Sequence, residues 1–364
     1  RESVQRNVPT AQTNRNSPSH PTDKAAESPE SELPKEGLVH FKSEEEYLAF
    51  LNNLSSSGLR LLGNSDALRT VRVAFTDLNQ ITDIDGSDVS PNFPVFIPAT
   101  PEVGVQSGAQ AFGASALESI GVFEDNSTWG KGITVAVIDS GVNQHIALKD
   151  GVKRLTLNKL AEDDTQLSHG TAVASIISGN HPLTQGVAPA ADILSIRITD
   201  AQGSSNSFTL AEGIVAATDW GAQIINISMG SEGNSIVVAD AVAYAQERGV
   251  VIVASAGNEG FDTPSYPAAY DGVISVGAVE ASGLHLDFSN TGENLSIVAP
   301  GFEVNAAWGN DQLTAFSGTS ASAPFVSGAI AAVMSENPGY TAQQATDLVL
   351  QLSNEAGQVG RDPQ

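Results

Sequence analysis

The most constrained stretch of this chain is residues 316–324, with the sequence FSGTSASAP. A tight Gly-containing turn ends at Ser320, and the mostly small residues from Ala321 to Ala332 predict a closely packed, buried helix. The first backbone N–H groups of a helix lack intrahelical partners, so they can hold a negative charge that develops beside the hydroxyl. A hydroxyl is a weak nucleophile alone, so this one needs a base from elsewhere in the chain.

Two upstream segments supply an acid and a base. Residues 132–141 (GITVAVIDSG) predict a buried parallel strand with Asp139 at its carboxyl end, the edge where sites form in open α/β sheets. His169 begins a small, apolar helical run that stops near Gly179. Taken singly, Asp139 is typical of a turn or helix cap, and His169 of a structural histidine.

The three motifs together, in the order Asp, His, Ser, resemble the subtilisin-like serine proteases. The matching segments are 137–141 (VIDSG), 169–171 (HGT) and 318–324 (GTSASAP). The resemblance covers about 115 to 355 and implies an α/β fold, a subtilisin-like three-layer domain with a central, mostly parallel sheet. It also implies a serine endopeptidase that forms an acyl-enzyme and needs no cofactor.

The resemblance assigns a role to each catalytic side chain. Ser320 attacks the peptide carbonyl, His169 takes its proton and returns it to the leaving amine, and Asp139 orients the imidazole. A fourth residue, Asn258, follows an apolar strand at 249–255 and stands in a Gly-Asn-x-Gly turn. By itself Asn258 is typical of a turn residue, but the resemblance implies that it donates to the oxyanion together with the Ser320 N–H.

The resemblance also maps a substrate groove. Residues 203–205 match an edge segment that pairs with an extended peptide by β-augmentation, and the other positions match a side-chain pocket. The small residues there predict a roomy pocket without a fixed charge, although ordinary strand and turn packing also explains each position. The mapped groove residues are Gly203, Ser204, Ser205, Ser228, Met229, Gly230, Ala256, Gly257 and Ser265.

Three positions depart from the usual family pattern. Ala172 and Phe325 stand where the family commonly has histidine, and Ala321 stands where it commonly has methionine. None of these positions carries a proton transfer, so we interpret the changes as repacking. The Tyr266-Pro267 pair matches a cis peptide of the family.

The chain before the catalytic part divides by composition. Residues 1–35 are rich in Ser, Pro, Asn, Glu and Thr and predict a disordered tail. Residues 36–97 alternate strand-like runs with a helix that starts at a Ser43–Glu46 capping box, which predicts a small α+β domain. Residues 98–114 form the expected linker, where maturation cleavage would fall, and 115–358 form the catalytic domain.

The position of the small domain suggests a propeptide that acts as an intramolecular inhibitor, and the alternative is an unrelated accessory domain. The leading hypothesis for the whole chain is therefore an active endopeptidase made as a zymogen and acting on protein or peptide substrates. Two other hypotheses are a non-catalytic regulatory protein on a protease scaffold and a processing protease with one narrow peptide substrate.

Composition limits the partners and the compartment. The chain has 17 Lys and Arg against 42 Asp and Glu, a net charge of −25, which argues against nucleic-acid binding. It has no Cys and no apolar run of the roughly 20 residues that a membrane span needs. No signal peptide is visible, and the resemblance implies an exported protein, extracellular or periplasmic.

The family often binds calcium for stability. The acidic run at residues 162–164 could contribute ligands, but a solvated loop is the favoured interpretation, so no metal site is predicted.

Overall fold

The computed structural model describes residues 35–82, 84–99, 101, 108–150, 152–157 and 168–353. The residues from Lys35 onward belong to one compact unit. The predicted disordered tail lies outside the described residues except for Lys35, and so do residues 100 and 102–107 of the predicted linker.

Seven parallel strands form the central sheet in the described part of the chain. In spatial order they are β13 (Ile297–Pro300), β12 (Ile274–Val279), β11 (Val251–Ser255), β10 (Ile224–Ile227), β6 (Thr134–Asp139), β8 (Asp192–Arg197) and β7 (Lys153–Thr156). Ile225 of β10 lies opposite Ala136 of β6 on one side and Ile252 of β11 on the other. The predicted α/β class with a mostly parallel sheet is confirmed.

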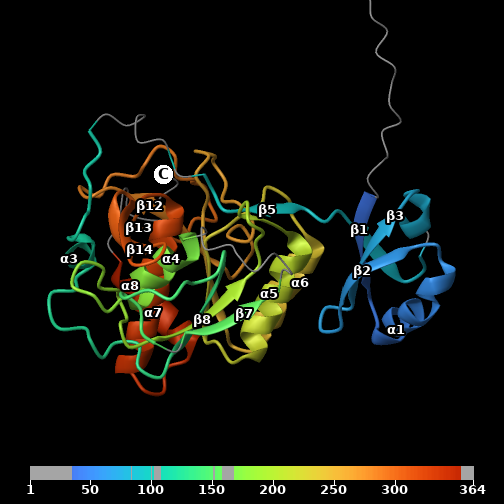
Figure 1. The fold of residues 1–364 in the computed structure, drawn as a ribbon, viewed down its shortest axis with the longest axis horizontal. Coiled ribbons are helices and arrows are strands. Elements are labelled where there is room, and N and C mark those ends of the chain that lie inside the picture. The colour runs from blue at the N-terminus through green and yellow to red at the C-terminus, as the bar shows by residue number, and fades with distance from the viewer. Residues whose placement is uncertain are drawn as a thin grey trace, which may run out of the picture. The chain divides into compact units, whose positions relative to one another are not determined.

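Helices cover both faces of this sheet, and this explains why its central strands are apolar without alternation. Figure 1 shows α5 (Ser207–Asp219) and α6 (Ile236–Glu247) side by side on one face, with α4 (His169–Ser178) and α7 (Thr319–Glu336) on the other. Along β6, Val135 and Val137 belong to the core shared with α4 and α7. Ala136 and Ile138 belong to the core shared with α5 and α6.

A second, antiparallel sheet forms the N-terminal domain. Its strands are β1 (Lys35–Phe41), β2 (Arg60–Ser65), β3 (Thr70–Phe75) and β4 (Ser87–Ser90), in the order β2-β3-β1-β4. The helix α1 (Glu44–Asn53), the turn η1 (Leu54–Ser56) and the short helix α2 (Asn79–Thr82) complete it. The predicted capping box is confirmed, because Ser43 Oγ accepts from the Glu46 N–H and Glu46 Oε2 accepts from the Ser43 N–H.

The strand β5 (Pro94–Phe96) leaves this domain. It is the last of the strand-like runs of residues 36–97, but its hydrogen bonds go to β9 (Ser204–Asn206) and not to the antiparallel sheet. The last strand of the antiparallel sheet is instead β4, which the sequence pattern did not predict. The segment that follows the N-terminal domain therefore lies on the predicted substrate edge.

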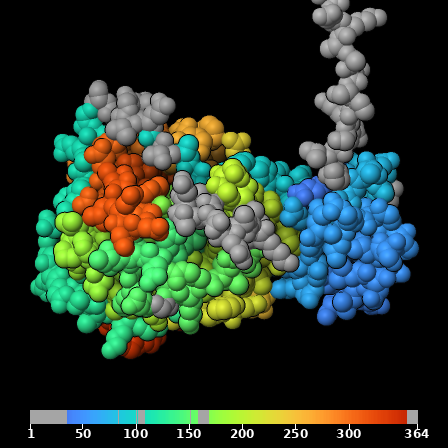
Figure 2. Space-filling model, in the orientation of Figure 1, coloured from blue at the N-terminus to red at the C-terminus, as the bar shows by residue number. Residues whose placement is uncertain are grey.

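Three smaller elements complete the part of the chain that contains the parallel sheet. They are α3 (Ala116–Ser119), the hairpin of β14 (Val304–Trp308) and β15 (Gln312–Phe316), and the closing helix α8 (Ala342–Leu352). The start of β15 is joined to the chain after β6, since His145 Nε2 lies 2.9 Å from the Gln312 carbonyl oxygen. The space-filling view shows orange atoms of the C-terminal part of the chain next to green atoms from its middle, although the two segments are far apart in the sequence (Figure 2).

No helix among the described residues is both long and apolar enough to cross a membrane. The Tyr266-Pro267 peptide is cis, as expected.

Candidate active site

A buried acid and an imidazole form the centre of the site. Asp139 ends β6 in the middle of the sheet and is fully buried, and His169 is the first residue of α4. His169 Nδ1 lies 2.9 Å from both carboxylate oxygens of Asp139. Since a carboxylate only accepts, Nδ1 carries the proton of this hydrogen bond, and the other ring nitrogen of the neutral imidazole is left as a base.

The surroundings of this pair hold it in place. The Ser140 N–H donates to Asp139 Oδ1 at 2.6 Å, and the Ser140 hydroxyl accepts from the Gly170 N–H at 3.1 Å. A Cβ at position 170 would clash with the Gly141 carbonyl and lie 3.1 Å from Asp139 Oδ1, so only glycine allows α4 to start this close to β6. The ring of Phe316 meets the imidazole edge to face.

Ser320 lies in the first turn of α7, after a glycine. Gly318 has φ of 120°, and a side chain there would come within 2.9 Å of the Asn258 amide nitrogen. In this structure Ser320 Oγ donates to the Ser228 carbonyl at 3.2 Å. Among the described residues, no hydrogen bond joins this hydroxyl to the His169 ring. A rotation about the Cα–Cβ bond redirects the hydroxyl, and such contacts are often absent before substrate binds.

Asn258 is fixed beside Ser320. Its Oδ1 accepts from the N–H and from the hydroxyl of Thr319, both at 2.9 Å. The Thr319 hydroxyl oxygen also accepts from the Gly257 N–H at 3.2 Å. These bonds orient the amide so that Nδ2 points outward, where it lies 3.4 Å from the Ala99 carbonyl oxygen.

The predicted peptide-binding edge is occupied by the chain itself. Phe96 exchanges two backbone hydrogen bonds with Gly230, at 3.0 and 3.1 Å, and the Ile97 N–H donates to the Gly203 carbonyl at 3.2 Å. Val95 and Phe96 lie opposite Ser205 and Ser204. The segment therefore runs as a strand between residues 203–206 and Gly230.

The side chains of this segment alternate between the groove and the outside. Val95 is completely buried, whereas Phe96 is 49% exposed. Such alternation is what a strand seated on a groove shows.

The residues mapped to the side-chain pocket have distinct surroundings. The backbone carbonyl of Ala256 accepts from the Ser265 N–H at 2.8 Å and from Asn290 Nδ2 at 3.0 Å. Gly257 has φ of 110°, and a Cβ there would come within 2.7 Å of Ser265 Oγ. The Met229 side chain is completely buried in the core with α5 and α6, so only its backbone is available to a substrate.

One residue of this region was missed by the sequence interpretation. Glu259 Oε2 accepts from Asn290 Nδ2 at 2.9 Å and would lie 2.5 Å from a Cβ at Gly257. A carboxylate thus stands against the mapped pocket wall, at a place where the sequence pattern indicated no fixed charge. The signal was present in the Gly-Asn-Glu-Gly turn, but sequence does not show which way an exposed side chain points.

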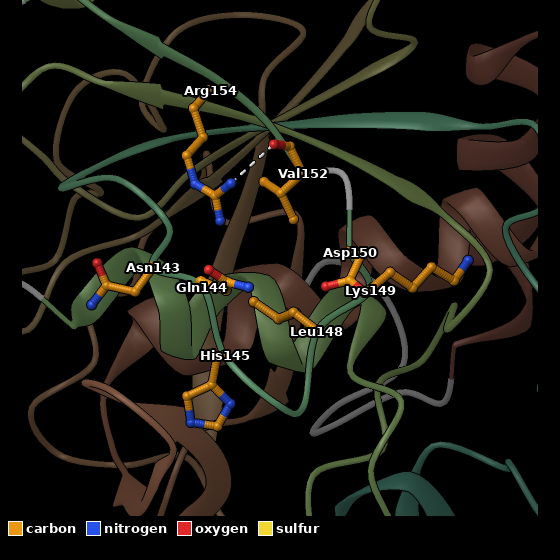
Figure 3. A pocket seen from close by; sticks show the side chains of 8 residues that line it. All are labelled: Asn143, Gln144, His145, Leu148, Lys149, Asp150, Val152 and Arg154. Carbon is orange, nitrogen blue, oxygen red and sulfur yellow. Dashed lines mark hydrogen bonds between the residues drawn. The ribbon is translucent and has the colours of Figure 1, made fainter.

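A separate pocket of about 180 Å³ lies along the chain that follows β6, and it contains none of the predicted site residues (Figure 3). Its lining is Asn143, Gln144, His145, Leu148, Lys149, Asp150, Val152 and Arg154. The guanidinium of Arg154 donates to the Val142 carbonyl at 2.7 Å and to the Val152 carbonyl at 3.1 Å. These bonds brace the backbone, so we interpret this arginine as structural.

No cluster of three or more His, Asp or Glu side chains suited to a metal ion occurs among the described residues. The acidic run at residues 162–164 lies outside them.

Comparison with known proteins decides the family. The sequence profile of the subtilase family matches residues 130–362. The chain belongs to the subtilase family. The match spans β6, α4 and α7, the elements that hold Asp139, His169 and Ser320.

Similar proteins include several bacterial enzymes. The thermostable alkaline protease of Halalkalibacterium halodurans is 35% identical over 63% of this chain and 64% of that enzyme. Subtilisin Savinase of Lederbergia lenta is 34% identical over 64% of this chain and 86% of that protein.

A solved structure extends the likeness beyond the family match. It is fervidolysin from Fervidobacterium pennivorans, described as a keratinolytic enzyme related to subtilisin, and it superposes with a TM-score of 0.72 at 26% identity. The superposition covers 87% of this chain and 57% of fervidolysin. This subtilase therefore spans less than two thirds of the length of the Halalkalibacterium halodurans protease and of fervidolysin.

We predict that Gly170→Ala disturbs the Asp139–His169 pair. The added methyl must displace the Gly141 carbonyl or the carboxylate, and overpacking of this kind costs about 1–3 kcal/mol of unfolding free energy. Urea unfolding and the NMR signal of the imidazole Nδ1–H, both measured in a Ser320→Ala background, check this. Ala329→Ser, which adds one atom at a partly buried position of α7, should change neither; an unaltered Nδ1–H signal in Gly170→Ala would contradict the prediction.

Proposed function

We propose that this subtilase is an active serine endopeptidase made as a zymogen. The observation that carries the proposal is the fully buried Asp139 carboxylate hydrogen-bonded to His169 Nδ1, with Ser320 at the start of α7 beside the Asn258 amide. A non-catalytic scaffold has no need for a buried carboxylate that orients an imidazole.

The proposed mechanism follows from the donors and acceptors. Ser320 Oγ turns from the Ser228 carbonyl toward the free nitrogen of His169 and gives it a proton as it attacks the peptide carbonyl. Asn258 Nδ2 and the Ser320 N–H donate to the oxyanion, and Asp139 stabilises the imidazolium. His169 then returns the proton to the leaving amine, and water hydrolyses the acyl-enzyme.

The N-terminal domain is proposed as the intramolecular inhibitor. Support comes from β5, whose backbone takes the hydrogen bonds that an extended substrate would take from Gly203 and Gly230. The Asn92 side chain adds to this, since its Oδ1 accepts from the Ser207 hydroxyl and the Phe208 N–H, both at 3.0 Å. While these bonds persist, no other peptide can pair with the same edge.

We expect the enzyme to act outside the cell. One relative, from Bacillus subtilis, is named a minor extracellular protease, and 34% identity covers 65% of this chain. The excess of acidic residues favours solubility.

Labelling with a fluorophosphonate tests the activity. The full chain, incubated so that processing can occur, should become labelled on Ser320, and Ser320→Ala should abolish the label. The matched control is Ser322→Ala, another buried serine of α7, which should still be labelled. Absence of Ser320-dependent label from processed protein would favour the non-catalytic scaffold.

The maturation bond is expected to be Ala99–Thr100. The carbonyl of the residue before the cut bond must reach the oxyanion donors, and the Ala99 carbonyl is the one that lies 3.4 Å from Asn258 Nδ2. Mass spectrometry of the mature protein should therefore show an N-terminus at Thr100, and pure Ser320→Ala protein should stay uncut. A different N-terminus would refute this bond, and cutting of the variant would refute self-processing.

Glu259 predicts a preference for Lys or Arg before the cut bond, because a cation in the mapped pocket would approach its carboxylate. Glu259→Gln should lower kcat/KM for a Lys substrate by about threefold to tenfold, the size of one partly solvated charge pair. A Leu substrate of the same sequence is the control and should be unaffected. Equal loss on both substrates, or a loss that persists undiminished in high salt, would contradict the electrostatic explanation.

A further inference from the structure

A row of hydrogen bonds through three buried polar side chains links the middle of α7 to the Ser320 carbonyl in its first turn. Ser327, Asn226 and Ser228 have no exposed surface, and Ser320 is 3% exposed. Ser327 Oγ lies 2.9 Å from Asn226 Oδ1, Asn226 Nδ2 lies 3.0 Å from Ser228 Oγ, and Ser228 Oγ lies 3.2 Å from the Ser320 carbonyl oxygen. The sequence interpretation mapped Ser228 to the substrate groove and took no account of Ser327 or Asn226.

This row of hydrogen bonds compensates for one that the helix lacks. In an α-helix the carbonyl of Ser320 accepts from the N–H four residues later, but that residue is Pro324, which has no N–H. A buried carbonyl without a donor is costly. The Ser228 hydroxyl supplies the missing donor, and in return Ser320 Oγ donates to the Ser228 carbonyl at 3.2 Å.

The direction of each bond in the row is determined by chemistry. An amide oxygen only accepts, so Ser327 donates to Asn226 Oδ1, and this places the NH₂ group of Asn226 against Ser228. Ser228 Oγ accepts from that NH₂, so its own proton is directed to the Ser320 carbonyl. If the Asn226 amide turned over, its oxygen would instead take the Ser228 proton, and the Ser320 carbonyl would lose its donor.

Ser327 disfavours this inversion, because its hydroxyl proton now goes to Asn226 Oδ1 and would need another acceptor if the NH₂ group faced it. A serine in a helix interior often donates to a carbonyl of the preceding turn, but the hydrogen bond of Ser327 crosses to β10. With alanine at position 327 either orientation of the amide would be allowed.

We propose that Ser327 is a positioning residue for the nucleophile, acting through Asn226 and Ser228 on the Ser320 backbone. The inference rests on the proposed protease function. The first turn of α7 presents both the Ser320 hydroxyl and the Ser320 N–H. In this proposal its position is fixed by the row of hydrogen bonds that starts at Ser327, seven residues further along the same helix.

The test compares Ser327→Ala with Ser322→Ala in the full chain after processing. Ser322 is equally buried on α7 and donates to the Ala299 carbonyl at 3.1 Å, so its loss matches the cost of one buried hydrogen bond. Hydrolysis of a chromogenic peptide is measured per active site, counted by fluorophosphonate titration, so that misfolded protein does not contribute. We expect Ser327→Ala to lower kcat about tenfold with KM within about twofold, since misplacement of a reacting group acts on kcat, while Ser322→Ala keeps the kcat of the parent.

A double variant separates positioning from stability. If Ser327 acts through Ser228, then Ser228→Ala with Ser327→Ala should have the kcat of Ser228→Ala alone. Multiplied losses, or a kcat for Ser327→Ala equal to that of Ser322→Ala, would overturn the inference. The side-chain NH₂ signals of Asn226 give a readout independent of turnover: a single sharp pair in the parent, broadened or doubled in Ser327→Ala.

The two proposals fail differently. A parent protein that neither labels nor hydrolyses peptide refutes the protease function. A parent that does both, alongside a Ser327→Ala variant with unchanged kcat and unchanged Asn226 signals, refutes only the role of Ser327.

Discussion

The hydrogen bond between Asp139 and His169 is the interaction on which the site depends. Burial of a carboxylate is costly unless donors surround it, and Asp139, with no exposed surface, has the Ser140 N–H at 2.6 Å and the imidazole at 2.9 Å. Its place as the last residue of β6, between β10 and β8, comes from the register of the sheet. The sheet thus holds the Asp139 carboxylate in a fixed place away from solvent, where it orients His169, the proton acceptor.

The helices α4 and α7 supply the two side chains that exchange a proton in the reaction. His169 and Ser320 both stand at the start of a helix on the same face of the sheet, where the N–H groups of the first turn have no partner within the helix. Asn258 is tied to the start of α7 through Thr319. In this structure the Ser320 hydroxyl bonds to the Ser228 carbonyl, so it must turn toward His169 to complete the arrangement.

The sequence predicted those strands, helices and caps that are determined by residues close together in the chain. The apolar run ending in Asp139, the helix starting at His169 and the capping box at Ser43 all have local causes, and each was confirmed as an element. The pairing of β5 with β9 could not be predicted, because a three-residue strand shows no preference among several free edges. Glu259 and Ser327 were missed for a related reason: the significance of each side chain depends on a partner, Asn290 or Asn226, that is distant in the sequence.

The most direct test of the account is a crystal structure of the fluorophosphonate adduct. The account predicts phosphorus bonded to Ser320 Oγ, the phosphoryl oxygen within hydrogen-bond distance of Asn258 Nδ2 and the Ser320 N–H, and the His169 ring still paired with Asp139. An adduct whose phosphoryl oxygen points away from both donors, or an imidazole separated from the carboxylate, would contradict it.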